Sequence, residues 1–310
     1  MRVPHLIPYQ GSKRNIAKHI LSFFPTDIGT LVEPFAGSAA VSLATAFYGK
    51  AKRFHINDIN EPLMQLWREL VEHPKRIANA YRRLWREQLG DERLFYDKVR
   101  DEFNRCKRPE HLLYLLARCV KASVRYNDQG EFNQSPDNRR NGREPDSMEE
   151  DIVSVSALLR SRVKITSQDY REILQSVRDT DLVYMDPPYQ GVCNRRDSRY
   201  SSGVAIQEIT ETLKMLVDSG TSFILSYDGR CGNKTYGRGL PHALGLAHIE
   251  IEAGRSAQAT LLGREEVTYE SVYLSDALVR RLRAESRSRV EFPKHIRKPL
   301  QLTFGALIDV

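Results

Sequence analysis

The chain has 310 residues, which is enough for one large domain or for a domain that carries a smaller insertion. Apolar residues make up 41% of the sequence, so a buried core is expected and wholesale disorder is excluded. The net charge of +7 makes nucleic acid a candidate partner, although many soluble proteins are mildly basic without binding a polyanion.

Cysteine spacing and apolar runs limit the class of protein further. Four cysteines are scattered, without a C-x-x-C pair or a histidine at ligand spacing. We therefore predict no metal site, no disulfide framework and a reducing compartment. The sequence shows neither the apolar core of a signal peptide nor a run of transmembrane length, so we expect a cytoplasmic protein with no membrane partner.

The first predicted elements form a strand–turn–helix–strand unit. A strand at Gly29 to Phe35 leads into a turn of small residues and a helix at Val41 to Tyr48, and a second strand follows at Arg53 to Ile56. Asp58 stands just after that strand. This order, with an acidic residue at the end of the second strand, is expected of a parallel nucleotide-binding sheet.

The turn of small residues is the first candidate binding element. Asp58 lies 21 residues after Gly37, a separation at which a carboxylate commonly holds a ribose. The glycine fingerprint of phosphate-binding loops is absent, and Glu33 before the turn would repel a pyrophosphate but suits a cofactor with a cationic amino-acid end. A glycine required only for helix packing explains the same spacing, which therefore leaves both interpretations open.

Residues 61–154 have the pattern of a helical insertion. From Glu61 to about Leu116, apolar residues recur at helical spacing among many arginines and lysines, which predicts helices with a basic face. A polar loop follows at Arg125 to Asp146. We assign residues 1–60 and 155–278 to one discontinuous domain around this insertion, and residues 279–310 to a basic C-terminal tail, for which DNA contact and a solvated helix are both open.

The second half of the chain supplies the remaining elements. The pattern predicts strands at Val163 to Thr166, which ends near Asp169, at Thr180 to Met185 and at Ser222 to Ser226, a helix at Ile206 to Ser219, and a final antiparallel pair at Ala247 to Ile251 and Tyr269 to Leu274. Together these elements predict an α/β fold with a mostly parallel sheet and an antiparallel final strand.

The tetrapeptide Asp186-Pro187-Pro188-Tyr189 is the second candidate binding element. Its two prolines stop the preceding strand and fix the backbone. A carboxylate and an aromatic ring beside that rigid turn form a small slot at the carboxyl end of the strand, where open α/β sheets bind ligands. The alternative is a turn that ends a strand and carries a surface acid; the apolar strand before it and the tyrosine favour the slot.

Four motifs, in this order, resemble those of the Dam-type adenine-N6 DNA methyltransferases, also called the D12 class or α-group. They are Pro8-Tyr9-Gln10-Gly11-Ser12-Lys13, Glu33-Pro34-Phe35-Ala36-Gly37-Ser38, Asn57-Asp58 and Asp186-Pro187-Pro188-Tyr189. Arg125-Tyr126-Asn127 and Gly130-Glu131-Phe132-Asn133 are similar to part of the family's DNA-recognition insertion. Two positions depart from the family: Ala39 replaces a second glycine, which predicts a slightly different turn, and Tyr9 replaces a frequent tryptophan.

The resemblance implies a Rossmann-like methyltransferase fold in which the discontinuous domain binds S-adenosylmethionine. Glu33 to Gly37 would form the turn beneath the methionine end of the cofactor, Asp58 would accept hydrogen bonds from the ribose, and Asp169 would contact the adenine amino group. The full set of cofactor-binding residues that it implies is Tyr9, Gln10, Gly11, Lys13, Glu33, Pro34, Phe35, Gly37, Asp58, Asp169 and Asp186.

The resemblance also implies methyl transfer to N6 of an adenine flipped out of duplex DNA, with Asp186, Pro187, Pro188 and Tyr189 as the catalytic residues. The Asp186 carboxylate and the Pro187 carbonyl oxygen would accept the N–H groups of the target, and Tyr189 would stack on the base. This chemistry requires no metal. A monomer is expected, and a partner restriction endonuclease and a solitary enzyme both fit the resemblance.

DNA reading is expected from the insertion. Arg125 is the candidate base contact, because arginine can pair with guanine O6 and N7 at once; a phosphate contact and an ion pair with Glu131 are the alternatives. The other DNA-binding candidates are Asn127, Arg139, Arg140 and Arg143, of which the arginines would hold phosphates.

Three rival functions share some of these sequence features. An RNA methyltransferase shares the chemistry on a flipped base, but the insertion resembles that of DNA enzymes. A catalytically silent DNA-binding protein of the same fold is disfavoured by the intact Asp186, Tyr189 and Asp58. A nucleotide-dependent oxidoreductase is disfavoured by the missing pyrophosphate fingerprint.

Overall fold

The centre of the molecule is a sheet with the strand order β3-β2-β1-β4-β5-β8-β7, seen in a computed structural model that describes residues 2–120, 124–188, 206–231, 234–236, 240–255 and 267–288. The short β6 (Lys234–Tyr236) pairs with β5 beside this path. The other strands are β1 (Ile28–Glu33), β2 (Ala51–Asn57), β3 (Val163–Thr166), β4 (Leu182–Met185), β5 (Phe223–Cys231), β7 (Ala247–Arg255) and β8 (Val267–Leu274).

The strand directions confirm the predicted sheet. The five strands β1 to β5 run parallel to one another, and β8 runs antiparallel to both β5 and β7. β4 is buried along its whole length, as expected for a central parallel strand with both faces covered. β5 continues past the predicted end at Ser226, because a bulge between Ser226 and Gly229 lets its pairing with β8 resume through a polar segment.

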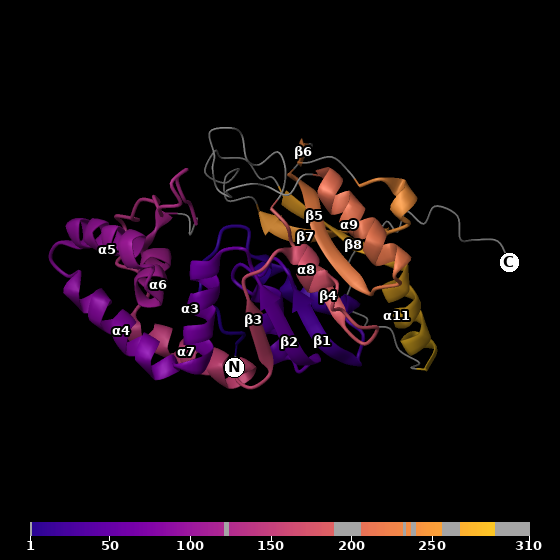
Figure 1. Ribbon diagram of the computed structural model, residues 1–310, viewed down its shortest axis with the longest axis horizontal. Helices are drawn as coiled ribbons and strands as arrows, with labels where there is room; N and C mark the ends of the chain where they lie inside the picture. The colour runs from indigo at the N-terminus through magenta and orange to yellow at the C-terminus, as the bar shows by residue number, and fades with distance from the viewer. Residues whose placement is uncertain are drawn as a thin grey trace.

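Helices cover both faces of the sheet (Figure 1). On one face, α8 (Tyr170–Leu174) and α9 (Ile206–Asp218) pack on residues of β4 and β5. On the other face lie α1 (Ala17–Ile20) and α2 (Ala40–Phe47), with short 3-10 turns at Lys13–Asn15, Leu21–Phe23 and, elsewhere, His242–Leu244. None of the described helices is both long enough and apolar enough to cross a membrane.

The insertion forms helices, as its pattern predicts: α3 (Glu61–Glu72), α4 (Pro74–Glu87), α5 (Glu92–Cys106), α6 (Pro109–Arg118) and α7 (Pro145–Leu159). α4, α5 and α6 lie beside the sheet at one end of the molecule (Figure 1). The expected boundary at residue 154 falls within α7, which runs on to Leu159. We therefore propose a division into a sheet domain and an insertion, with α7 shared between the two.

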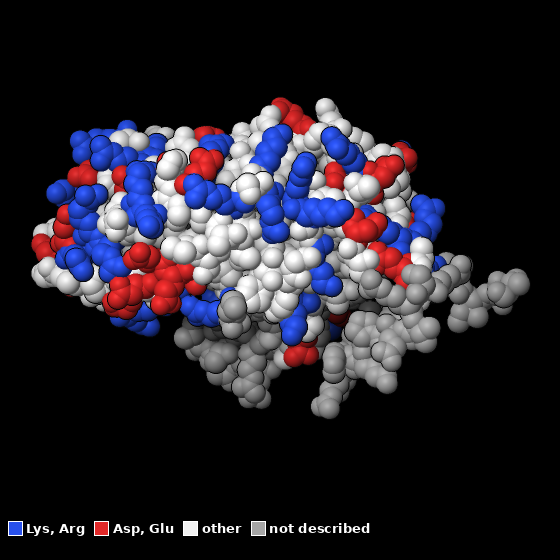
Figure 2. Space-filling view, turned by 90° about the horizontal axis from the view of Figure 1, so that it is seen from below, with Lys and Arg blue, Asp and Glu red and all other residues white. Residues whose placement is uncertain are grey.

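Charges of both signs occur together on the insertion. Arg82 of α4 donates to both Asp146 and Glu149 at 2.6 Å, and Arg76 pairs with Glu69. Figure 2 shows Lys and Arg side chains interleaved with Asp and Glu over this end of the molecule. The excess of basic residues read from the sequence is thus partly compensated by neighbouring carboxylates, and such surface pairs contribute little to stability.

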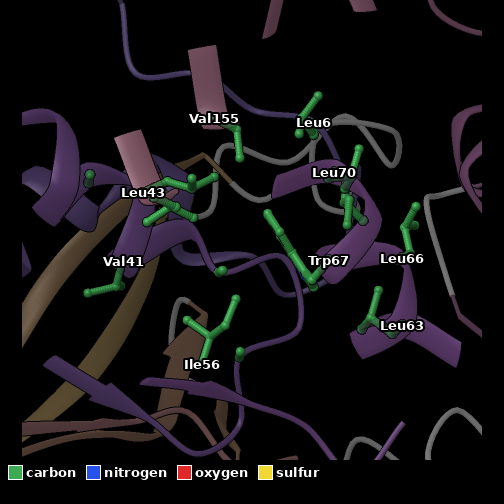
Figure 3. Close-up of a cluster of buried hydrophobic side chains, with 14 of the residues drawn as sticks. Leu6, Val41, Leu43, Ile56, Leu63, Leu66, Trp67, Leu70 and Val155 are labelled. Atoms are coloured by element: carbon green, nitrogen blue, oxygen red, sulfur yellow. The ribbon is translucent and has the colours of Figure 1, made fainter. Parts of the chain in front are cut away.

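One continuous core joins the insertion to the sheet. Leu63, Leu66, Trp67 and Leu70 recur at helical spacing, so all four lie on the buried face of α3. Figure 3 shows this face beside side chains of the first βα unit and of α7, among them Val41, Leu43, Ile56 and Val155. The helices of the insertion are therefore anchored through α3 and α7 to the first strands of the sheet.

The described part of the basic tail packs on the sheet. α11 (Asp276–Ser288) buries Leu278 completely, and Arg281 pairs with Asp27 and donates to the carbonyl oxygen of Thr180. Asp27 and Thr180 precede β1 and β4, so this helix lies at the amino ends of the parallel strands. Residues 289–310 of the tail lie outside the described residues.

Candidate active site

Four acidic residues predicted from the sequence lie at the carboxyl edge of the sheet. Glu33 ends β1, Asp58 follows β2, Asp169 follows β3 and Asp186 follows β4. The four strands are parallel neighbours, so their carboxyl ends meet at one edge. Residues far apart in the chain are thus brought to a single region.

The turn after β1 is held from several sides. Gly37 has a positive φ of 48°, and a Cβ at this position would come within 3.1 Å of the Tyr9 ring. Its N–H donates to the Asp58 carboxylate at 3.0 Å, and its carbonyl oxygen accepts from the Trp67 indole at 3.0 Å. Glycine at this position therefore suits both the left-handed backbone and the close approach of Tyr9.

Ala39, where the family usually has glycine, still adopts the left-handed conformation, with φ 47° and ψ 36°. A left-handed alanine carries about 1–2 kcal/mol of strain. We expect Ala39→Gly to relieve that strain while losing one buried methyl group. The matched control Ala44→Gly, in the interior of α2, loses a buried methyl and adds roughly 1 kcal/mol of helix penalty.

In denaturant unfolding without cofactor, the free energy of unfolding of Ala39→Gly should therefore be about 2 kcal/mol higher than that of Ala44→Gly. Equal free energies of unfolding for the two variants would contradict the strain at Ala39.

Glu33 is a buried carboxyl group beneath this turn. Its side chain accepts hydrogen bonds from the N–H and the hydroxyl of Ser42, at the start of α2. Burial raises the pKa of Glu33 to about 8, although the Ser42 hydrogen bonds lower it, and the charges of Asp186 and Asp58 raise it further. Such a group is mostly protonated at neutral pH and would ionise when a cation arrives beside it.

Asp58 is half-buried and already oriented by backbone groups. Its two carboxylate oxygens accept from the N–H groups of Gly37 and Asn60, both at 3.0 Å. Burial raises its pKa, and these two hydrogen bonds oppose the rise. A carboxylate offers about four acceptor positions, so room remains for two hydroxyl donors of a ligand.

Lys13 and Asp186 form an ion pair that joins two of the sequence motifs. The Lys13 Nζ lies 2.8 Å from Asp186 and also donates to the carbonyl oxygen of Gly11 at 3.1 Å. Burial alone would lower the pKa of Lys13, but the carboxylates of Asp186 and Glu270 raise it above its ordinary value. The N-terminal motif and the motif after β4 therefore meet as a charged pair at the carboxyl edge.

Most of the chain, from Tyr9 onward, has the sequence of a known enzyme family. Residues 9–253 match the family described as D12 class N6 adenine-specific DNA methyltransferase. The chain belongs to this family. S-adenosylmethionine is the methyl donor of these enzymes, and the residues at the carboxyl edge fit it: a buried carboxyl for an ammonium group, a glycine turn with a tyrosine ring close to its backbone, and a carboxylate for a ribose.

Curated relatives include methyltransferases from several sources. The chain is 31% identical over 206 residues to the type II methyltransferase M.MjaIII of Methanocaldococcus jannaschii, covering 61% of this chain and 70% of the relative. It is 28% identical to the retron Ec67 DNA adenine methylase of Escherichia coli, over 60% of this chain and 64% of the relative. It is 25% identical to M.CviBI of Paramecium bursaria Chlorella virus NC1A, over 72% and 86%. The match thus spans slightly less than two thirds of the retron enzyme.

Two predicted cofactor residues of this D12 methyltransferase have internal partners. Asp169 caps α8 by accepting from the Arg171 N–H at 2.8 Å and pairs with the Arg171 side chain at 2.7 Å, which lowers its pKa. The Phe35 ring packs against the Tyr170 ring in a tilted arrangement, with the ring centroids 4.8 Å apart. Both lie at the expected edge, and their described contacts favour roles in shaping it.

The remaining motif residues frame the site. Pro34 is held through its carbonyl oxygen by the Asn57 amide, and Gln10 lies half-buried in the N-terminal turn that leads to Lys13. Pro187 is buried and Pro188 half-buried after β4. The predicted stacking residue Tyr189 lies outside the described residues.

The loop predicted to read DNA is fixed on α5. Phe132 is buried against Phe103, and the Asn104 side chain both donates to the Phe132 carbonyl and accepts from its N–H. The Asn127 side chain forms hydrogen bonds within the loop itself, donating to the Glu131 carboxylate and accepting from two backbone N–H groups. The geometry therefore favours a turn-forming role for Asn127, while Arg125 lies half-buried beside it.

The three arginines expected to hold phosphates differ in their surroundings. Arg139 is exposed, and Arg140 is exposed but paired with Asp137 at 2.7 Å. Arg143 donates to Asp151 at 2.7 Å, to the carbonyl oxygen of His5 at 2.7 Å and to Ser147. The structure favours an internal role for Arg143, which ties the N-terminal segment to α7, over the predicted phosphate contact.

Three residues for which no role in the site was predicted lie beside it; Asn57 belongs to a motif, and Trp67 and Ile59 belong to none. Trp67 supports the Gly37 carbonyl from the insertion, and the buried Asn57 joins the ends of three strands by donating to Pro34 and to the carbonyl of Gln168. Ile59, next to Asp58, is 73% exposed. Its place in the chain, directly after the motif residue Asp58, was the available signal for Ile59.

Proposed function

We propose that this methyltransferase acts on specific sequences of duplex DNA, transferring a methyl group from S-adenosylmethionine to N6 of a flipped-out adenine. The observation that carries the proposal is the 2.8 Å pair of Lys13 and Asp186 at the edge where Glu33 and Asp58 also lie. The proposed site for the methyl donor, at Glu33 and Asp58, is then adjacent to Asp186, which would accept a hydrogen bond from the amino group of adenine.

The proposed cofactor site uses the turn after β1. Glu33 would bind the ammonium group of the cofactor, and Asp58 would accept hydrogen bonds from its ribose hydroxyls. Tyr9 and Gly37 would line the space between these two carboxylates. The exposed Ile59 would cover an aromatic face of the ligand, because an apolar side chain in that position loses unfavourable contact with water on binding.

The bound cofactor supplies an electrophilic methyl group on a sulfonium. The residues of the chain then have to make the exocyclic nitrogen of adenine a better nucleophile. Asp186 would accept one N–H and the Pro187 carbonyl oxygen the other, which favours a tetrahedral nitrogen with an available lone pair. Tyr189 would stack on the extruded base and offset part of the flipping cost, since such stacking is worth about 1–3 kcal/mol.

Sequencing of genomic DNA at single-molecule resolution tests the proposal. A methylation-free bacterial host expressing this protein should carry N6-methyladenine at one short sequence, and a host expressing Asp186→Ala should not. Modified adenine only in RNA would favour the rival RNA methyltransferase, and a folded, cofactor-binding protein without any transfer would mark a silent binder.

Arg125 is proposed as the base-reading residue, and this assignment makes a separate prediction. Arg125→Ala should relax the preference at one base pair, with a loss of about 1–3 kcal/mol of discrimination. Arg139→Ala, which changes an exposed arginine of the same loop region, should weaken binding evenly across sequences. Methylation rates on a set of singly substituted duplexes distinguish the two; a uniform loss for Arg125→Ala would assign it to phosphate.

We further propose that the enzyme works as a monomer in the cytoplasm. Several relatives carry type II names, which motivates the proposal that a cognate restriction endonuclease accompanies it. Light scattering of the purified protein tests the oligomeric state. Resistance of the methylated host DNA to one endonuclease, lost with Asp186→Ala, tests the pairing with a nuclease.

A further inference from the structure

Polar side chains line one face of the sheet near its carboxyl edge. The Tyr184 hydroxyl of β4 lies 2.8 Å from the Ser226 hydroxyl of β5, and both residues are buried. Ser226 is paired with Val272 of β8, so the side chains of Ser226 and Val272 lie on the same face of the sheet. Glu270 is two residues from Val272 and therefore shares this face, which is the one that Lys13 covers.

Lys13 contacts two carboxylates. Its Nζ lies 2.8 Å from Asp186 and 3.9 Å from Glu270, and the side chain is only 5% exposed. Glu270 belongs to none of the sequence motifs and is separated from Lys13 by almost the whole described chain. One carboxylate would suffice to neutralise a buried ammonium group, so the second calls for an explanation.

The bulge in β5 sets the place of Glu270. The register shifts between Ser226 and Gly229, and Gly229 is the partner of Glu270 across the two strands. A Cβ on Gly229 would lie 2.6 Å from the Tyr269 carbonyl oxygen, so the two backbones approach more closely than any side chain permits. Bulges commonly re-aim side chains beside active sites, and this one lies directly next to the carboxylate that faces Lys13.

We propose that Glu270 is a positioning residue for methyl transfer, which holds Lys13 in place while the Asp186 oxygens accept the amino group of the target adenine. The inference rests on the proposed role of Asp186. As Asp186 takes up an N–H donor, its interaction with Lys13 weakens, and a buried ammonium group without compensation is costly. Glu270 supplies that compensating negative charge, so Asp186 can accept a hydrogen bond from the adenine amino group while Lys13 stays in place.

Glu270→Gln tests this, because it removes the charge and keeps the shape. The matched control is Glu250→Gln, on β7, whose carboxylate pairs with Arg230. We expect Glu270→Gln to lower kcat about tenfold with both KM values nearly unchanged, and to move the alkaline limb of the kcat–pH profile to lower pH, since Lys13 loses one of the two carboxylate charges that raise its pKa. Glu250→Gln should leave both readouts as in the wild type.

Two further variants separate positioning from folding. Glu270→Asp retains the charge and should keep most of the wild-type kcat. In a Lys13→Met background, Glu270→Gln should have no additional effect on the residual single-turnover rate, because Glu270 acts through Lys13. An undiminished effect in that background, or equal losses for the Asp and Gln variants, would overturn the inference.

The inference also fails if kcat and the alkaline limb of Glu270→Gln match those of Glu250→Gln while the wild type methylates DNA and Asp186→Ala does not. That outcome leaves the proposed function intact. A wild-type enzyme without activity on DNA adenine would instead remove the proposed function, and the inference with it.

Discussion

Asp186→Ala should reduce DNA methylation to background, a loss on the order of a thousandfold or more, while cofactor affinity changes little. The reason is the position of the carboxylate after β4, where it is the charged acceptor at the proposed amino-group site. Removing it takes a carboxylate at 2.8 Å away from the buried Lys13, so some thermal stability should be lost as well. Tritiated methyl transfer and calorimetric titration with S-adenosylmethionine measure the two effects.

Two controls keep the loss of activity separate from a loss of fold. Asp186→Asn retains a carbonyl acceptor for Lys13 and should fold like the wild type, yet remain severely impaired because the acceptor is neutral. Asp179→Ala removes an exposed carboxylate before the same strand, at the opposite edge of the sheet, and should leave the rate unchanged. Turnover by Asp186→Ala near that of Asp179→Ala would remove Asp186 from the catalytic residues.

The fold was predictable from local patterns. β3 has the bounds that the alternation and the flanking polar residues indicate, and α9 ends one residue before the predicted position. These elements are specified by their own side chains, because burial on one or two faces imposes a period on each segment. β5 was underestimated for the same reason: beyond Ser226 it is polar, and only its pairing with β8 extends it.

The candidate site was predictable where a motif encodes a backbone shape. The turn around Gly37 and the residues after β2 and β4 lie together because parallel strands end at one edge. Interactions between distant residues were not predictable. Nothing in the sequence near Arg143 indicates that its donors are taken up by Asp151 and His5, and nothing near Glu270 indicates that it faces Lys13.

Cofactor binding should release a proton at neutral pH, because Glu33 has a pKa of about 8 in the unbound protein. At pH 7 roughly nine in ten molecules carry a protonated Glu33, and an ammonium group beside it requires the carboxylate. Titrations of the wild type in two buffers with different ionisation enthalpies should therefore show release of about 0.9 proton for each cofactor bound at pH 7. Glu33→Gln should show no release and bind roughly two to three orders of magnitude more weakly.

The same carboxyl should make the unbound protein less stable as the pH rises. Between its ordinary value of 4.5 and about 8, Glu33 holds a proton in the folded chain that the unfolded chain has lost, so the free energy of unfolding falls as the pH increases through this window. Glu33→Gln removes that dependence. It should therefore be more resistant to heat than the wild type at pH 8 without cofactor, and show a smaller advantage at pH 5. A variant that binds the cofactor weakly yet gains no stability at pH 8 would mean that Glu33 is already ionised in the folded protein, with its charge held by Ser42 before the ligand arrives.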